Sequence, residues 1–258
     1  MPLITEETDG HVRKIGLNRP EKRNAFSMAM LEELSAAYAR AEADANVRVI
    51  VLYAHGAMFT AGLDLLDVFP RLGQGASLFP KDQMDPWGTH GKERTKPVVT
   101  AIHGKCLTLG IELALAGDVV FASADATFAQ IEIARGIFPF GGGTARWIQT
   151  TGWGNAMQYL LTGDEFDAKE AHRIGVVQRL VARESLLDDA VAFAQRIAAQ
   201  APLGVLATIA SARKALREGE RAAAVELLPK IMQLAGTLDA QEGVAAFVER
   251  RPPVFRGA

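Results

Sequence analysis

Apolar residues occur first in a short strand-like group and then at helical spacing within the first 50 residues. The group at residues 12–17 follows a turn at Gly10, and Pro20, which lacks an N–H, ends it; this pattern predicts a β-ribbon. Ser27 then caps a predicted helix that runs to about Asp44. The apolar positions of that helix keep the three-to-four spacing of one buried face: Met30, Leu31, Leu34, Ala37, Tyr38 and Ala41.

Nearly continuous apolar runs recur along the middle of the chain. Val47–Ala54 is such a run, which is typical of a strand covered on both faces. The pattern returns at Pro97–Ile102 and Val119–Ala122, with helical composition between them at Leu107–Ala116, and one more strand is predicted at Val176–Val181. Strand and helix therefore alternate, which predicts an α/β fold with a parallel sheet.

Two other regions differ from this alternation. Glycine and proline punctuate residues 70–93, so we expect a mobile loop or lid there. From Thr144 onward the chain is mainly helical, and no internal repeat or low-complexity segment is present. The clearest predicted helices in this part are Leu186–Ala199, Leu203–Leu216 and Ala222–Leu238.

Composition indicates a folded protein and excludes several classes of function. Of 258 residues, 49% are apolar and 22% are charged, which is close to ordinary globular usage. The net charge of -2 offers no basic excess for nucleic acid or an anionic membrane, so we expect neither partner. Residues 1–20 lack a signal-peptide pattern, and no charge-free apolar run approaches the roughly 18 residues of a membrane span. The single cysteine, Cys106, excludes a disulfide framework and favours a cytoplasmic location.

The segment Phe59–Asp64 directly follows a predicted buried strand and its turn. Ala61 and Gly62 are small enough for the backbone to approach a ligand closely. The same residues also suit the start of a helix, with Asp64 at the positive end of the helix dipole. Taken alone, the segment leaves a binding role and a purely structural role open.

Glu112 is the one ionisable group in the predicted helix Leu107–Ala116. Burial of an unpaired carboxylate is costly or raises its pKa, so such a residue needs a partner, a chemical role or a route to solvent. The alternative is that Glu112 faces water on an amphipathic helix. The first interpretation makes it a candidate catalytic acid or base.

Glu132 lies in another candidate segment, which ends in a glycine run. Strand alternation would place Phe128, Gln130 and Glu132 on one face. The alternative is a salt bridge at the rim of the protein, with Arg135 as the partner. The glycine run lacks the Gly-Lys-Ser/Thr ending of a P-loop and the strand turn of a dinucleotide fingerprint, so we exclude both types of phosphate site.

Cys106 and two histidines receive simpler interpretations. We expect Cys106 to be a small core residue, because no histidine lies at a spacing that would activate its thiol. His55 and His103 lie near predicted strand ends, where each can satisfy a backbone group. No spacing of potential ligands indicates a metal site, so we expect none.

Together these segments resemble the enoyl-CoA hydratase/isomerase (crotonase) family, and the resemblance extends over nearly the whole chain. Residues 17–25 (LNRPEKRNA) resemble the family's entry segment, and residues 59–64 its Ala-Gly-x-Asp segment. Residues 109–112 are similar to its Gly-x-Glu helix start, and residues 131–144 to its Pro-Glu…Gly-Gly-Thr stretch. Residues 242–255 (EGVAAFVERRPPVF) resemble its C-terminal trimerisation helix. The joint occurrence of these motifs in this order is specific.

The resemblance implies a fold, a substrate class and an assembly. The expected fold is a crotonase-like ββα superhelix core over residues 1–200, followed by a C-terminal helical trimerisation region over residues 201–258. The expected substrate is an acyl-CoA thioester, so coenzyme A is part of the substrate and no separate cofactor is needed. The expected assembly is a homotrimer or a homohexamer.

The resemblance also assigns roles to individual positions. The family's two oxyanion donors, which stabilise an enolate, match the backbone N–H groups of Leu63 and Leu109. The family's two catalytic glutamates, which hold one water, match Glu112 and Glu132 and form the expected acid–base pair. The remaining positions expected to bind the substrate are Lys22, Arg23, Ala25, Ala61, Gly62, Asp64, Leu65, Gly110, Pro139 and Phe140.

A few positions depart from the family's pattern and bear on the reaction. Thr108 and Leu109 stand where many hydratases have glycine, and Ile131 replaces the usual proline before Glu132. Phe140 stands where dienoyl-CoA isomerases and dehalogenases place a catalytic aspartate, so those two chemistries lose support. Retention of both glutamates favours an enoyl-CoA hydratase. The alternatives are an enoyl-CoA Δ3/Δ2 isomerase, which needs one carboxylate, and a non-catalytic acyl-CoA-binding member of the family.

Overall fold

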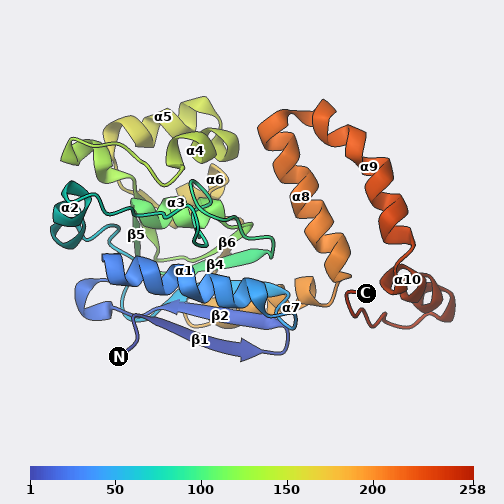
Figure 1. The fold of residues 1–258 in the computed structure, drawn as a ribbon. Helices are drawn as coiled ribbons and strands as arrows, with labels where there is room; N and C mark the ends of the chain where they lie inside the picture. Colours follow the sequence, from blue (N-terminus) through green and yellow to red (C-terminus); the bar gives the residue numbers. More distant parts are fainter.

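The computed structural model describes all 258 residues, and a six-stranded sheet forms the centre of the fold (Figure 1). Its strands are β1 (Ile4–Asp9), β2 (Val12–Leu17), β3 (Val49–Ala54), β4 (Val98–Ile102), β6 (Val119–Ser123) and β9 (Arg179–Val181). They lie in the order β1-β2-β3-β4-β6-β9, in which β1 is antiparallel to β2 and every other pair is parallel. The predicted α/β class is confirmed.

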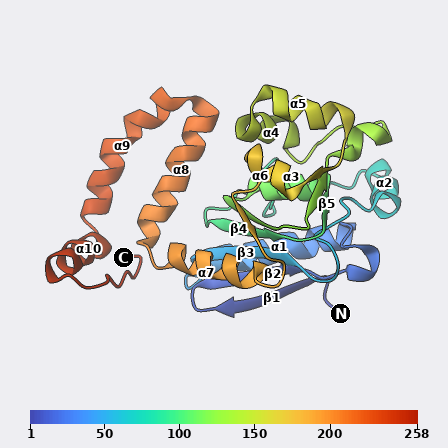
Figure 2. The same cartoon turned by 180° about the vertical axis from the view of Figure 1, so that it is seen from behind.

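Helices cover both faces of this sheet, with α1 (Met28–Ala43) on one face and α7 (Leu186–Ala198) on the other (Figures 1 and 2). Ile50 and Leu52 of β3 belong to the larger core, which includes the buried face of α1. The valines that alternate with them belong to the smaller core under α7. Successive side chains of a strand point to opposite faces, so a strand covered on both faces must be apolar throughout.

A second sheet and the remaining helices complete the core. Each of β4 and β6 leads into a strand of the small sheet and then into helical structure, which gives the ββα repetition expected of the superhelix. The small sheet has the order β5-β7-β8, with β5 (Lys105–Leu107), β7 (Thr127–Ala129) and β8 (Phe166–Asp167). The helical elements here are α3 (Leu109–Ala116), η2 (Ile131–Arg135), α4 (Gly143–Thr151), α5 (Trp153–Thr162) and α6 (Ala168–Arg173).

Some predicted elements differ from the observed ones at their boundaries. The predicted strand Val176–Val181 keeps only its last three residues, because residues 176–178 close the turn after α6; Val177 N–H donates to Ala171 O at 3.1 Å. Val177 is buried without being part of a strand, which explains the misleading apolar pattern. The helix predicted from Leu107 begins two residues later, because residues 105–107 pair with β7.

The region predicted as a loop at residues 70–93 is structured in part. Its first residues form the last turn of α2 (Leu65–Gly73), with Pro70 inside the helix. Further along, the carboxylate of Asp85 accepts the backbone N–H groups of Trp87 at 2.9 Å and of Thr89 at 2.7 Å. This segment is therefore an irregular but hydrogen-bonded turn that leads into β4.

The chain ends in three helices, α8 (Pro202–Glu218), α9 (Glu220–Ala235) and α10 (Leu238–Glu249). α8 and α9 form a hairpin that extends away from the sheet (Figures 1 and 2). The helix predicted to continue to Leu238 ends at Ala235, because Thr237 caps a new helix by accepting the N–H of Ala240 at 3.2 Å. No single helix has the length and hydropathy of a membrane span; α7 and α8, bent by 102° at their junction, reach those limits only when taken together.

Candidate active site

The segment Phe59–Leu63 runs beside β5 and packs against the residue that precedes α3. Thr60 N–H donates to Lys105 O at 3.1 Å, which fixes the segment along the small sheet. Gly62 has a φ of +87°, and a Cβ built there would lie 1.8 Å from Thr108 Oγ1. Glycine at this position therefore permits both the left-handed backbone and the close approach of the two segments.

Two backbone N–H groups beside this contact have no acceptor in the protein. Phe26 N–H donates to Gly62 O at 2.8 Å, and Asp64 N–H donates to Phe26 O at 2.9 Å. The N–H of the intervening Leu63 is therefore directed away from Phe26. Leu109 is the first residue of α3, and the N–H groups of a helix's first turn have no acceptor within the helix. The sequence-predicted donors are thus brought to one place.

Thr108 has an unusual backbone conformation immediately before Leu109. Its φ of 51° and ψ of −118° lie in a region that β-branched residues rarely adopt, and such a conformation costs about 1–3 kcal/mol. Thr108 N–H donates to Ala129 O at 3.0 Å, and its side chain packs against Gly62. These contacts hold a strained peptide whose orientation sets the direction of the Leu109 N–H.

Glu112 lies one turn into α3 and is completely buried, so the alternative of a water-facing residue is wrong. Its Oε1 accepts the backbone N–H of Gly143 at 2.7 Å, and a Cβ on Gly143 would lie 2.6 Å from the same oxygen. Its Oε2 is buried and has no partner. One oxygen is therefore fixed by the glycine run at the start of α4, and the other is free for a ligand.

Glu132 lies in η2 and is 4% exposed. The strand expected to carry the alternation ends at Ala129, although Phe128, Gln130 and Glu132 are all buried. The rim salt bridge is wrong because Glu132 is buried. Its Oε1 instead accepts Gln130 Nε2 at 2.9 Å, and Gln130 Oε1 accepts the indole N–H of Trp147 at 3.1 Å. An indole N–H can only donate, so it orients the amide with the NH₂ toward Glu132. The Glu132 Oε2 is buried without a partner.

The two carboxyl groups influence each other and titrate near neutral pH. Burial raises the pKa of Glu112 to about 7, and the charge of Glu132 acts in the same direction. Burial likewise raises the pKa of Glu132 to about 7. Because two like charges in one buried space disfavour each other, the pair retains a proton near pH 7. A protonated and an ionised carboxyl are the two groups that general acid–base catalysis requires.

The chain matches the family model described as enoyl-CoA hydratase/isomerase over residues 7–258. The chain belongs to the enoyl-CoA hydratase/isomerase family. A probable enoyl-CoA hydratase of Rhizobium meliloti is 36% identical, with 97% of this chain and 96% of that protein covered. A 2,3-dehydroadipyl-CoA hydratase of Escherichia coli is 34% identical, with 93% of each covered. The crystal structure of a probable enoyl-CoA hydratase/isomerase from Mycobacterium abscessus superposes with a TM-score of 0.97 at 52% identity, with 99% of each chain covered.

Glu112→Gln should stabilise this family member at pH 8. The folded-state pKa of Glu112, about 7, lies above the ordinary value of 4.5, so stability from its protonated form is complete below pH 4.5 and is lost as pH rises through 7. We expect the free energy of unfolding in urea to exceed that of the parent by about 1–3 kcal/mol at pH 8 and by much less at pH 5. A difference independent of pH would contradict this assignment.

Asp64 and Leu65 lie at the start of α2, next to the Leu63 donor. The Asp64 carboxylate forms an ion pair with Arg19 at 2.8 Å, and Arg19 also donates to Ala25 O at 2.9 Å. This pair connects the family's entry segment to the residue that follows Leu63. Asp64 is therefore engaged inside the protein, where it fixes the backbone near the donor.

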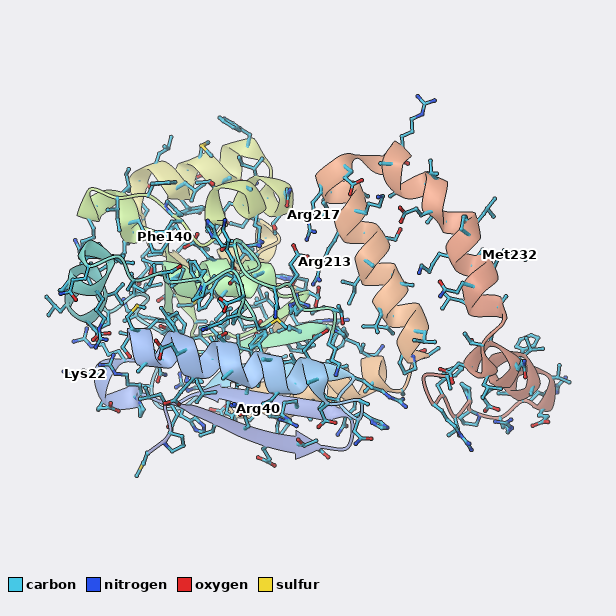
Figure 3. All side chains as sticks on the ribbon, viewed as in Figure 1. Lys22, Arg40, Phe140, Arg213, Arg217 and Met232 are labelled. Carbon is cyan, nitrogen blue, oxygen red and sulfur yellow. The ribbon has the colours of Figure 1, made fainter.

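The other predicted substrate-binding positions surround this region. Arg23 is exposed but its carbonyl accepts the N–H of Ala61 at 2.9 Å, while Lys22 is exposed at the end of η1 (Pro20–Lys22). Figure 3 shows Lys22 and Phe140 on the side of the core where α2 lies, remote from α8 and α9. Gly110 and Pro139 are buried and Phe140 is half-buried.

The residues that hold the glutamates in place were not predictable from the sequence. Gly143 was visible as part of the glycine run, but nothing in the run indicated which amide meets Glu112. Gln130, two residues before Glu132, was predicted only to lie on the same face as Glu132. Trp147 donates its indole N–H to Gln130, 17 residues earlier in the chain, and Trp87 donates its indole N–H to Leu109 O at 2.9 Å, 22 residues later. Contacts at such separations give no signal in the sequence.

The residues given simpler interpretations lie largely as expected. Cys106 is fully buried in the core, as predicted, and burial raises the pKa of its thiol. His103 Nε2 lies 3.0 Å from Gly56 O, as predicted for a strand end, whereas His55 contacts the Thr5 hydroxyl at 2.8 Å instead of a backbone group. No group of three or more His, Cys, Asp or Glu side chains is arranged to hold a metal ion.

Proposed function

We propose that this chain is an enoyl-CoA hydratase, which adds water across the double bond of a 2-enoyl-CoA. The observation that carries this proposal is the pair of buried glutamates, Glu112 and Glu132, each with one carboxylate oxygen held and the other unpartnered. Relatives named hydratases, which are similar over nearly their full length, support the same activity.

In this mechanism the N–H groups of Leu63 and Leu109 donate to the thioester carbonyl oxygen. Negative charge develops on that oxygen as an enolate forms, and a backbone donor placed for such charge contributes about 3–4 kcal/mol to lowering the barrier. The N-terminus of α3 adds a favourable dipole. Because the donors are backbone groups, leucine side chains at both positions are compatible with the role.

The two glutamates divide the proton transfers between them. One removes a proton from the water as its oxygen bonds to the β-carbon, and the other delivers a proton to the α-carbon, so the product is a 3-hydroxyacyl-CoA. Gly143 and Gln130 hold the non-reacting oxygens. The reaction needs no separate cofactor, since coenzyme A is part of the substrate. Lys22 and Arg23 supply the cations for the coenzyme A phosphates.

A Δ3/Δ2 isomerase is the second candidate, because the family description covers both reactions. An isomerase moves one proton between two carbons of the same ligand and needs a single carboxylate. Glu112 and Glu132 are both buried, and each has one hydrogen-bonded and one unpartnered oxygen. This similarity favours hydration, because hydration needs both carboxyl groups. A non-catalytic acyl-CoA-binding protein would need neither carboxylate at such a pKa.

A spectrophotometric screen over 2-enoyl-CoAs of several chain lengths tests the proposed function. Hydration removes the conjugated double bond, so the ultraviolet absorption of the enoyl thioester should fall with turnover. Loss of absorption with at least one chain length supports the hydratase. Tight binding of every enoyl-CoA with no loss of absorption would indicate the non-catalytic alternative.

We further propose that the chain acts in the cytoplasm as a homotrimer, alone or paired into a homohexamer, with residues 201–258 as the trimerisation region. Large apolar side chains on α9 and α10 are exposed, among them Leu228 at 75% and Phe247 at 85%. Figure 3 shows Met232 on the side of α9 that faces away from the core. Cavities of about 660 and 640 Å³ flank α8 on its core side and its α9 side. Exposed apolar surface of this extent is typical of an interface.

Leu228→Glu combined with Met232→Glu should therefore dissociate the assembly, because two charges would be buried in an apolar contact. Light scattering should give a mass of at least three 27.7 kDa chains for the parent and a smaller mass for the variant. Leu66→Glu, at a 91% exposed leucine on α2, serves as the control and should keep the parent mass. A monomeric parent at micromolar concentration would contradict the proposal.

A further inference from the structure

Trp87 connects the irregular segment before β4 to the first residue of α3. Its indole N–H donates to Leu109 O at 2.9 Å, and the side chain is 1% exposed. The ring packs edge-on against Phe26 with centroids 5.3 Å apart and at the same distance from Phe79. The indole is therefore fixed on both sides, so its N–H has a single direction.

The backbone around Trp87 is held as firmly as its ring. Asp85 is 2% exposed, and its carboxylate accepts N–H groups from Trp87 and from the next residues of the turn. From the other side, the Arg146 guanidinium donates to Trp87 O, and it also donates to Gly141 O at 2.9 Å. This arrangement anchors the tryptophan to the same glycine run that fixes Glu112.

Trp87 contacts Leu109, the residue that directly follows the strained Thr108. Thr108, with its φ of 51° and ψ of −118°, would relax if the peptide between Thr108 and Leu109 rotated. That rotation would turn the Leu109 N–H away from the site. The carbonyl of this peptide, Thr108 O, accepts the N–H groups of Ile111 at 2.9 Å and Glu112 at 3.3 Å. The neighbouring peptides are also held: Thr108 N–H donates to Ala129 O, and Leu109 O accepts the indole N–H of Trp87. The strained peptide is thus restrained at both ends.

Trp87 also lies beside the reacting groups without replacing any of them. The point where a Cβ on Gly141 would sit is 3.0 Å from Trp87 Cδ1, 2.6 Å from a methyl of Leu109 and 3.2 Å from Glu112 Oε2. The indole, the donor residue and the catalytic carboxyl therefore border one small space. The indole N–H of Trp87 nevertheless donates to the Leu109 carbonyl and not into this space.

We propose that Trp87 is a positioning residue, whose hydrogen bond to Leu109 O keeps the Leu109 N–H directed at the substrate's carbonyl oxygen. This inference rests on the proposed function, since it assigns Leu109 to the oxyanion hole. It concerns charge stabilisation in the transition state and not the affinity for coenzyme A. Loss of the hydrogen bond should therefore lower kcat and leave KM nearly unchanged.

Trp87→Phe tests the proposal because phenylalanine keeps an aromatic ring and lacks the N–H donor. We expect kcat for enoyl-CoA hydration to fall about 10-fold, less than full loss of a donor causes, with KM within about twofold of the parent. Trp153→Phe, at a 68% exposed tryptophan on α5, is the matched control and should keep the parent values. A Trp87→Phe enzyme with the parent kcat, or with a raised KM alone, would overturn the proposal.

A spectroscopic readout separates positioning from general structural support. 4-(Dimethylamino)cinnamoyl-CoA absorbs at longer wavelength when its carbonyl is polarised, so its shift on binding reports the oxyanion donors directly. We expect a smaller shift in Trp87→Phe and the parent shift in Trp153→Phe. Should Trp87→Phe fail to fold, replacement of Trp87 by β-(3-benzothienyl)alanine keeps the ring shape and removes only the donor.

The outcomes distinguish this inference from the proposed function. An unchanged shift and kcat in the benzothienyl variant, with a parent that hydrates enoyl-CoA, would overturn the role of Trp87 alone. A parent that hydrates no enoyl-CoA and produces no shift of the bound probe would overturn the proposed function and this inference together. A reduced shift with reduced kcat in the variant supports both.

Discussion

Glu112→Gln and Glu132→Gln should each lower kcat for enoyl-CoA hydration by roughly 10²–10⁴-fold, the contribution of a positioned acid or base. Hydration needs one group to activate water and another to deliver a proton, so neither glutamate can replace the other. Glutamine keeps the side chain's shape and can still accept the hydrogen bond from Gly143 or Gln130. Calorimetric titration with a saturated acyl-CoA should therefore show binding close to that of the parent.

The pattern of losses also separates the two reactions of the family. An isomerase would lose activity at one glutamate and keep it at the other, because a single carboxylate carries its proton. Glu184→Gln is the matched control, since Glu184 is exposed and far from α3 in the sequence. Close to full hydratase rate in either active-site variant would show that the two-glutamate mechanism is wrong.

Gly62→Ala should lower kcat by at least about 10²-fold, the loss expected when one oxyanion donor is displaced. The new Cβ would lie 1.8 Å from Thr108 Oγ1 and 3.3 Å from Leu107 O, so the two donor segments would have to separate. Separation of these segments moves the Leu63 and Leu109 N–H groups apart. Initial-rate kinetics, with circular dichroism to confirm folding, measure the effect.

Gly75→Ala is the matched control for this substitution. Gly75 has a φ of +88°, almost equal to that of Gly62, but nothing lies within 4 Å of the Cβ position. Both variants place an L-residue in the left-handed region, and only Gly62→Ala also introduces a clash. Equal losses of activity in the two variants would attribute the effect to backbone strain and contradict the contact between donor segments.

The large sheet was predictable from the sequence, and the small one was not. Strands such as Val49–Ala54 are covered on both faces, and this burial requires the continuous apolar run that was recognised. The strands of the small sheet are two or three residues long, which is too short for any period to appear. Leu107, the last residue of β5, was accordingly assigned to the following helix, and Lys105 and Cys106 were assigned to no element.

The site was predictable where its chemistry conflicted with its surroundings. Glu112 stood out because a single carboxyl in an apolar helix is costly, and the structure buries it completely. The environment of Glu132 depends on Gln130 and Trp147, whose contacts cannot be read from spacing along the chain. The donor roles proposed for Leu63 and Leu109 came only from the family resemblance, because a free backbone N–H leaves no trace in the residue type.

Isotope incorporation from water tests the proposed hydratase mechanism directly. The parent enzyme would be incubated with a short 2-enoyl-CoA in H₂¹⁸O, and the thioester product would be analysed by mass spectrometry. We predict a 3-hydroxyacyl-CoA that carries one ¹⁸O at carbon 3, and replacement of Glu112 or Glu132 by glutamine should strongly lower the rate at which this labelled product forms. A product in which the double bond has migrated without incorporation of ¹⁸O would contradict the hydratase assignment.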